Sequence, residues 1–522
     1  MRQAVAALFV ILGFAPRAAA TGFTDLGQDI EAHTEADLEL HGQLRLRAEL
    51  LHNLDLDRGL TPSGSPLFPV PLSDPTAQTL THFDMRLRAD FAAYAPGQGL
   101  AVKVRLDLLD NVGLGSLPDG VPSATSSQRS PSDVVHVERA YGEVLTPLGV
   151  LAAGRMGSQW GLGMLANGGD CADCDGGDSA DRVAFVTPVA GLVWAAAFDL
   201  SSSGPFVPRA NARRTVDLDP ADDALTLTFA VLSFRGDRAR TRRQRAGKST
   251  FDWGAYASHR WQSRDVPGSY IPTAQPVPLT PAQSMARGFR AIALDGWARF
   301  TAPWGRLEAE VALLAATIDQ ASLVPGALYR DPVQSLQLGA ALETDIGDPD
   351  GPFGVGLDAG YASGDPAPGF GAFPAPGQTA PRPGDLDGPQ ATPPADTRVD
   401  NFRFHPDYRV DRILFREIIG TVTDAVYLRP HVRVRIARAG PGELAASLAA
   451  VASWAVEPNS APGGESPLGV EIDPTIAYVT RDGLSAVAEY AVLFPLGGLA
   501  NAAADLSPRP AQLFRVRLGM VF

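Results

Sequence analysis

The only two cysteines of the chain lie in one short acidic segment. Residues 170–178 read Asp-Cys-Ala-Asp-Cys-Asp-Gly-Gly-Asp. In an exported protein the surroundings are oxidising, so Cys171 and Cys174 are expected to form a small disulfide. Carboxylates around a glycine are also typical of short calcium-binding loops. The segment therefore predicts a disulfide in an outer loop. It also suggests a Ca²⁺ site at Asp173, Asp175 and Asp178, and the two features are compatible with each other.

Positive charges recur at every second position of several segments. Such residues lie on one face of a β-strand, and the apolar residues between them lie on the other. If the strands close into a barrel, the last pairs with the first, and the cations form one wall. The residues expected to line this channel wall are Arg45, Arg47, Arg86, Arg88, Lys103, Arg105, Arg515 and Arg517, with a second group at Arg429 and Arg433.

The wall has two interpretations, and both stay open. A row of cations can attract an acidic solute and line its path. Acidic residues such as Glu49, Asp84 and Asp107 alternate with the cations, however, and can instead pair with them as a structural network.

Catalytic residues are not expected. None of the eight histidines begins a His-x-Ser spacing, and the chain has no nucleophile elbow, P-loop or His-Glu-x-x-His motif. A surface enzyme is therefore the least favoured class of function.

Alternation of apolar with polar residues recurs along most of the chain. Charges at every second position would break the apolar face of a helix, so the pattern indicates strands. We expect an all-β fold, a transmembrane antiparallel up-and-down β-barrel of about 18 strands, with 16 as the alternative. The expected strands are 37–51, 80–94, 99–110, 133–145, 149–161, 181–187, 190–200, 222–235, 250–263, 287–301, 305–318, 333–346, 352–364, 424–437, 443–457, 467–480, 483–495 and 511–522.

The lengths of the connections alternate as well. Connections after even strands are short, and most of those after odd strands are long, which is typical of barrels with periplasmic turns and outer loops. The exception is 236–249, where the strand count is open to error. The longest connection, 364–423, begins rich in proline and glycine, which predicts an irregular loop. Its part 401–420 is expected either to narrow the mouth or to cap the rim.

The two ends of the chain predict export. Residues 1–20 resemble a cleaved signal peptide, with a basic start, an apolar run and small residues at the cleavage site. Residues 21–36 are expected to be a short periplasmic segment, and 37–522 the barrel with its outer loops. The remainder holds no uncharged apolar run long enough for a membrane helix. The formal net charge of the whole sequence is −14, which disfavours nucleic-acid binding.

The last strand resembles the assembly signal of Gram-negative outer-membrane barrels, because it alternates and ends in Phe522. Segments 139–143 and 149–160 resemble a porin hairpin. Segments 360–365 and 407–411 resemble eighteen-stranded alginate-export-type barrels and an uncharacterised family of barrels. The resemblance implies the outer membrane of a Gram-negative bacterium, with lipid, the barrel-assembly machinery and small solutes as partners. It leaves the oligomeric state unknown.

Together these observations predict a porin-like channel for small hydrophilic, and by its basic wall anionic, solutes. The alternative is a barrel plugged by its own loops, with a structural or surface-interaction role. No cofactor other than the Ca²⁺ named above is expected.

Overall fold

The computed structural model describes most of the chain. The described residues are 22–27, 30, 35–97, 99–114, 135–208, 214–217, 219–266, 284–322, 328–348, 351–372 and 379–522. The expected signal peptide, 1–20, and part of the expected periplasmic segment, 21–36, lie outside them. No helix in these ranges is long and apolar enough to cross a membrane.

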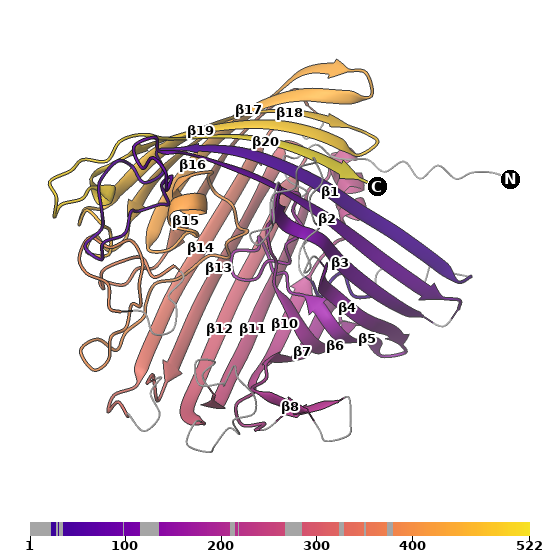
Figure 1. Cartoon of the computed structure of the whole chain (residues 1–522). Coiled ribbons are helices and arrows are strands. Elements are labelled where there is room, and N and C mark those ends of the chain that lie inside the picture. Colours follow the sequence, from indigo (N-terminus) through magenta and orange to yellow (C-terminus); the bar gives the residue numbers. More distant parts are fainter. Residues whose placement is uncertain are drawn as a thin grey trace, which may run out of the picture.

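Within this part of the chain, eighteen strands form one antiparallel sheet that closes on itself. Neighbours in the chain are neighbours in the sheet, and the indigo β1 lies beside the yellow β20 in Figure 1. The strands are β1 (Asp37–His52), β2 (Thr79–Ala95), β3 (Leu100–Gly113), β4 (Val135–Thr146), β5 (Gly149–Gly157), β6 (Ser179–Val189), β7 (Leu192–Ser202), β10 (Ala224–Ser233), β11 (Thr250–Asp265), β12 (Met285–Ala302), β13 (Gly305–Ile318), β14 (Val333–Ile346), β15 (Phe353–Ala362), β16 (Ala425–Ala439), β17 (Gly442–Ala455), β18 (Pro467–Thr480), β19 (Leu484–Pro495) and β20 (Ala511–Val521).

Closure of the barrel depends on the pairing of β1 with β20. Arg47 lies opposite Arg517, and Leu50 lies opposite Phe514. Phe522 continues this ladder, because its backbone N–H donates to the Gly42 carbonyl and its own carbonyl accepts from the Gly42 N–H. Closure leaves no strand edge unpaired, as a sheet in lipid requires. The prediction of 18 strands is confirmed, and the alternative of 16 is wrong.

The outer face of the barrel is apolar, and its inner face is polar. On β20, Phe514, Leu518 and Met520 point outward and are between 42% and 49% exposed, whereas Arg515, between them in sequence, is fully buried. The other strands expose large apolar side chains in the same way. Such a surface suits the hydrocarbon of a bilayer, and the whole is an outer-membrane β-barrel.

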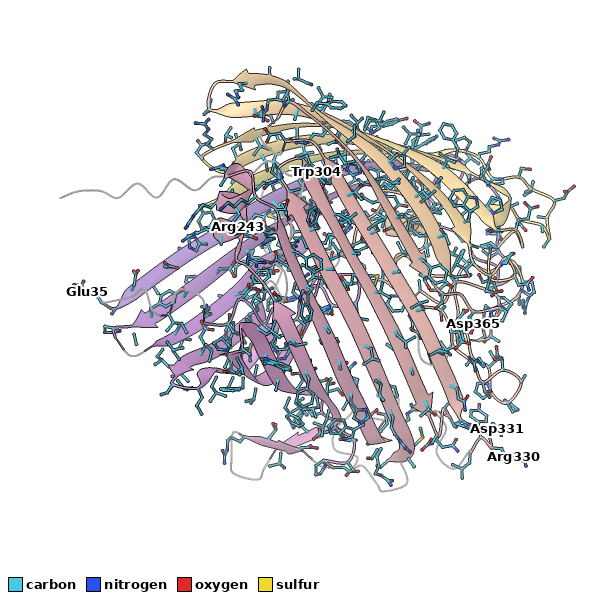
Figure 2. The ribbon with its side chains drawn as sticks, turned by 180° about the vertical axis from the view of Figure 1, so that it is seen from behind. Glu35, Arg243, Trp304, Arg330, Asp331 and Asp365 are labelled. Carbon is cyan, nitrogen blue, oxygen red and sulfur yellow. A yellow bond between two sulfur atoms is a disulfide. The ribbon has the colours of Figure 1, made fainter. Side chains whose placement is uncertain are left out.

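Short turns and long loops lie at opposite ends of the barrel. Figure 2 shows Glu35, Arg243 and Trp304 toward one end and Asp331 and Asp365 at the other. Glu35 belongs to the N-terminal segment, Arg243 to the connection between β10 and β11, and Trp304 to the turn between β12 and β13. The end of the barrel that carries the N-terminal segment and these connections is therefore the periplasmic end.

Two irregular positions differ from expectation. The connection 236–249 holds a short helix, α1 (Asp237–Arg245), so the strand count there was correct and the extra length is helical. Proline removes a ladder hydrogen bond, so Pro430 within β16 predicts a bulge or distortion at that position. Its register with β15 is continuous. Against β17 the pairing is interrupted at Arg429 and Pro430 without a change of register, and the shift of register falls between Arg435 and Ala437.

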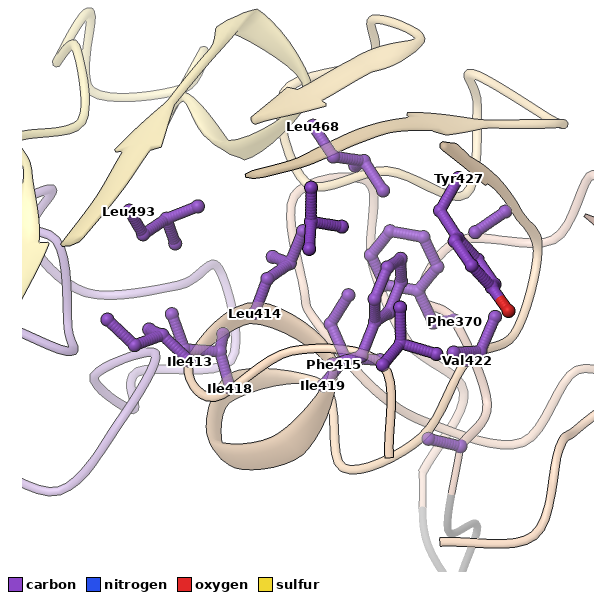
Figure 3. Close-up of a cluster of buried hydrophobic side chains, with 14 of the residues drawn as sticks. Phe370, Ile413, Leu414, Phe415, Ile418, Ile419, Val422, Tyr427, Leu468 and Leu493 are labelled. Carbon is purple, nitrogen blue, oxygen red and sulfur yellow. The ribbon is translucent and has the colours of Figure 1, made fainter. Parts of the chain in front are cut away.

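The long loop between β15 and β16 folds into the outer end of the barrel. Its short π-helix η4 (Leu414–Ile418) packs apolar side chains against inward residues of the wall, including Tyr427, Leu468 and Leu493, as Figure 3 shows. A lumen lined only by polar residues could not accept this segment. Burial of its apolar side chains therefore fixes the loop inside the barrel rather than on its rim.

Candidate pore constriction

A first loop, residues 158–178 between β5 and β6, also folds into the lumen. The indole Nε1 of buried Trp160 donates to Asp295 Oδ1 at 2.8 Å. The backbone N–H groups of Leu162 and Leu165 both donate to the Glu310 carboxylate. Carboxylates of the barrel wall therefore hold the base of this loop, and its acidic tip is carried across the lumen.

The tip meets the basic wall through backbone oxygens. The Cys174 carbonyl accepts from Arg45 at 2.9 Å and from Arg86 at 2.7 Å, and the Gly169 carbonyl accepts from Arg88 at 2.6 Å. Cys171 and Cys174 form a disulfide, with their Cα atoms 5.1 Å apart. The bridge closes a small turn that presents the Cys174 carbonyl to two guanidinium groups at once.

The carboxylates of the tip meet the same wall. Asp175 lies 2.9 Å from Arg45 and 3.0 Å from Arg47, and Asp173 lies 2.9 Å from Arg517. Asp170 pairs with Arg105 and, at 2.9 Å, with Arg139. The tip thus supplies the negative charge that the cations of β1, β3, β4 and β20 require.

These ion pairs shift the pKa values of the loop carboxyls. Burial alone would raise the pKa of Asp175, but the surrounding guanidinium groups, first Arg409 and then Arg47, outweigh it and hold the pKa well below its usual range. Arg416, Arg517 and Arg515 do the same for the partly buried Asp173. Both side chains are therefore charged across the physiological pH range.

The second inward loop completes the layer. Arg409 reaches Asp175 at 2.7 Å, and Arg416 reaches Asp173 at 2.5 Å. The Asp407 carboxylate accepts the backbone N–H groups of Asp175, at 2.9 Å, and Gly176, at 3.1 Å. The two inward loops are therefore bound to each other as well as to the wall. Of the two roles open for 401–420, the structure has the inward one.

A wall carboxylate also holds this second loop. Glu471 of β18 accepts backbone N–H groups of Arg412 at 2.8 Å, Ile413 at 2.9 Å and Leu414 at 3.1 Å. These donors at the start of η4 have no partner within the helix, and the carboxyl oxygens of Glu471 satisfy them. Glu471 and Glu310 thus play the same part for the two loops.

The carboxyl of Asp411, also at the start of η4, has a raised pKa. Burial raises the pKa of Asp411 to about 7, and the nearby Asp473 adds to the effect against the backbone N–H groups of Phe415 and Arg416. This loop carboxyl therefore gains or loses a proton near neutral pH.

The structure brings the expected wall residues together but does not leave them free. Arg45, Arg86 and Arg515 are at most 1% exposed. Arg88 also binds Asp107, Arg47 binds Asp84, and Arg515 binds Glu49. Lys103 binds Glu143 at 2.6 Å. Of the two interpretations of the wall, the structural network is the one that these contacts favour.

The second basic group lies elsewhere in the lumen. Arg429 pairs with Asp358 at 2.6 Å, and Arg433 lies near it on β16. Both line the cavity on the periplasmic side of the loops.

The calcium expectation at Asp173, Asp175 and Asp178 stays a prediction. Guanidinium groups surround the first two carboxylates, and a divalent cation there would have to displace them. Asp178 lies apart from them, 3.5 Å from the His405 ring.

Two cavities meet at this layer of ion pairs in the described part of the chain. One has a volume of about 630 Å³ and extends from Asp411 to the α1 helix at the periplasmic end. The other has a volume of about 560 Å³, and His82, Pro406 and Gly420 are among the residues that line it. Both are lined by Asp407, Arg409 and Arg416. The layer formed by these residues with Asp173 and Asp175 is called the constriction below.

The alternation of the strands places Glu310 and Glu471 on the inward face, but nothing in the sequence marks them as anchors of the loops. Their partners are backbone N–H groups, which every residue except proline carries, so no side-chain pattern marks them.

Comparisons with known proteins concern the barrel as a whole. No protein-family model matches the chain, and no curated protein matches it. Solved structures that resemble it include OpdK of Pseudomonas aeruginosa with vanillate, at TM-score 0.45 and 12% identity, over 93% of this chain and 98% of that one. OccK11 (OpdR) of the same organism has TM-score 0.45 and 12% identity, over 94% and 98%. The trimer form of OmpT of Vibrio cholerae has TM-score 0.34 and 10% identity, over 94% and 100%. Similarity at this level says nothing of the solute.

Proposed function

We propose that this barrel is a diffusion channel for small hydrophilic solutes, with the constriction as its narrowest point. The observation that carries the proposal is that the outer and periplasmic cavities are lined by the same three residues, Asp407, Arg409 and Arg416. A solute that passes these side chains moves from one cavity to the other.

The charges of the constriction suit a solute with an anionic group. Asp173 and Asp175 form ion pairs with arginines of both the wall and the second inward loop. A carboxylate on a solute offers the same bidentate geometry to arginine. The two aspartates would then act as internal anions that an anionic solute replaces in passing, one guanidinium at a time.

The substitutions Asp173→Asn and Asp175→Asn together test this proposal. They remove two negative charges beside Arg47, Arg409 and Arg416 and leave the side-chain volumes almost unchanged. We expect the ratio of anion to cation permeability to rise several-fold, measured from the reversal potential in a salt gradient across a planar bilayer. The control is Asp181→Asn, because Asp181 is half-exposed and pairs with Arg155 away from the constriction.

Unchanged permeability in the double variant, with steady conductance, would contradict the role of the two aspartates. A folded wild-type barrel that never conducts would contradict the channel itself. It would favour the plugged barrel, which the apolar packing of η4 supports as the second candidate.

A further inference from the structure

A second acidic cluster lies in the outer loop between β7 and β10, far from the constriction in sequence. The loop contains a small hairpin of β8 (Phe206–Pro208) and β9 (Thr215–Asp217), which lies at the outer end of the barrel (Figure 1). Asp217 ends β9, and Asp222 and Asp223 stand just before β10. One carboxylate oxygen from each of these three residues lies within 4.8 Å of the others.

Asp222 distinguishes this cluster from an ordinary acidic surface. Its side chain is only 1% exposed, and among the described residues no donor makes a well-aligned hydrogen bond to either of its carboxylate oxygens, although the backbone N–H of Gly204 lies near them. Asp223 Oδ1 is buried and unpartnered in the same way. A buried carboxylate without a donor is costly, and buried polar groups in native proteins are almost always satisfied. Asp217, beside them, already accepts the backbone N–H of Asp219 at 3.0 Å, but three carboxylates this close together still favour a positive partner.

The described ion pairs supply no positive charge to these three carboxylates. Arg264 lies 3.7 Å from Asp219, and no ion pair with Asp217, Asp222 or Asp223 is formed among the described residues. Gln262 donates to the backbone carbonyl of Asp222 and not to its side chain. A Cβ at Gly204 would come within 1.8 Å of Asp222 Oδ2, so the glycine leaves room for this carboxylate.

We propose that Asp217, Asp222 and Asp223 form a Ca²⁺ site. Carboxylate oxygens are the ligands that hard cations prefer, and the cluster contains no histidine or cysteine for a softer metal. Ca²⁺ takes oxygen ligands at about 2.3–2.6 Å, so oxygens on opposite sides of the ion stand about 5 Å apart, as the cluster allows.

The bound ion links two parts of the loop. Asp217 pairs with Phe206 across the β8–β9 hairpin, whereas Asp222 and Asp223 lead directly into the barrel wall at β10. Ca²⁺ therefore holds the hairpin against the outer rim. This role does not depend on transport, so it can succeed or fail independently of the channel.

The test uses the full folded barrel in detergent, freed of metal with a chelator and titrated with CaCl₂ by calorimetry. We expect one saturable site with a Kd on the order of 10⁻⁴–10⁻³ M, the range of extracellular calcium modules. Asp222→Asn should weaken binding at least about tenfold, and Asp223→Asn should weaken it in the same direction. The matched control is Asp110→Asn, because Asp110 belongs to a separate group with His136 and Glu138.

A second readout localises the ion. Arg214 is exposed beside the hairpin, so trypsin should cleave after it more slowly when Ca²⁺ is bound. At ten times the Kd, the cleavage rate should fall by about tenfold if only the metal-free loop is cut. Heat-modifiable migration on gels shows that each variant is a folded barrel.

Three results would overturn the proposal. They are the absence of saturable binding by wild type, binding that Asp222→Asn and Asp223→Asn leave unchanged, and loss of binding in Asp178→Asn or Asp110→Asn instead. Loss of binding in Asp178→Asn would place the ion in the first inward loop, and loss of binding in Asp110→Asn would place it at the group of Asp110, His136 and Glu138.

Discussion

Removal of the Glu471 carboxylate should loosen the second inward loop without disturbing the barrel. In Glu471→Ala, three backbone N–H groups at the start of η4 lose their acceptor. A buried donor left unsatisfied costs about 1–3 kcal/mol, which sets an upper limit of about 9 kcal/mol. Water from the cavity that Arg412 lines can reach part of this site, so we take about 3 kcal/mol as the expected loss.

This loss predicts a measurable change in local opening. Since about 1.4 kcal/mol is a factor of ten, the fraction of molecules with the start of η4 opened should rise by about 100-fold. Amide hydrogen exchange followed by mass spectrometry should show this at residues 412–414. The current through single channels should also become noisier, because Arg409 and Arg416 belong to the same loop.

The matched control is Glu443→Ala. The Glu443 carboxylate of β17 is 12% exposed and pairs with Arg435 at 2.6 Å, and among the described residues it forms no ion pair with either inward loop. Its removal should leave exchange at 412–414 unchanged. Equal exchange in wild type and Glu471→Ala, with equal current noise, would refute the reasoning that this carboxylate holds the loop.

Two further predictions concern pH and assembly. Folding lowers the pKa values of Asp173 and Asp175, so their contribution to stability is present above the ordinary aspartate pKa of about 4 and is lost as the pH falls below it. The constriction should therefore persist at pH 5–8 and open only under strong acid. A conductance transition near pH 6 that is traced to these two residues would contradict the ion pairs. The backbone of Phe522 pairs with Gly42, and the ring of Phe522 lies over Gly42. Deletion of Phe522 should therefore lower the yield of heat-modifiable barrel in membranes several-fold, whereas the control Phe514→Leu should leave the yield unchanged. Normal assembly without Phe522 would contradict its role as the assembly signal.

The barrel could be predicted from the sequence because its signal is local. Alternation along a strand needs only neighbouring residues, so the face of Arg45 or Arg515 follows from the period alone. Pairing of β20 with β1 then follows from closure, although the two strands lie at opposite ends of the chain. Even the short strand β6, expected at 181–187, is present at Ser179–Val189.

The constriction could not be predicted in the same way. Asp175 is separated from Arg47 by 128 residues and from Arg409 by 234, and no local pattern joins them. The composition of 170–178 suggested calcium, because aspartates beside glycine suit a cation. In the fold, the cations that surround Asp173 and Asp175 are arginines of the barrel itself. The acidic residues 217–223, which drew no expectation from their sequence, became a candidate only when the structure showed Asp222 buried.

The most direct test of the central claim is the single-channel conductance of the refolded barrel in a planar bilayer, with a salt gradient. Steady conductance in wild type, with anion preference that rises in the Asp173→Asn, Asp175→Asn variant, is the result that a channel narrowed by these ion pairs predicts. A barrel that is shown to be folded but remains silent, in wild type and in the variant alike, would contradict it.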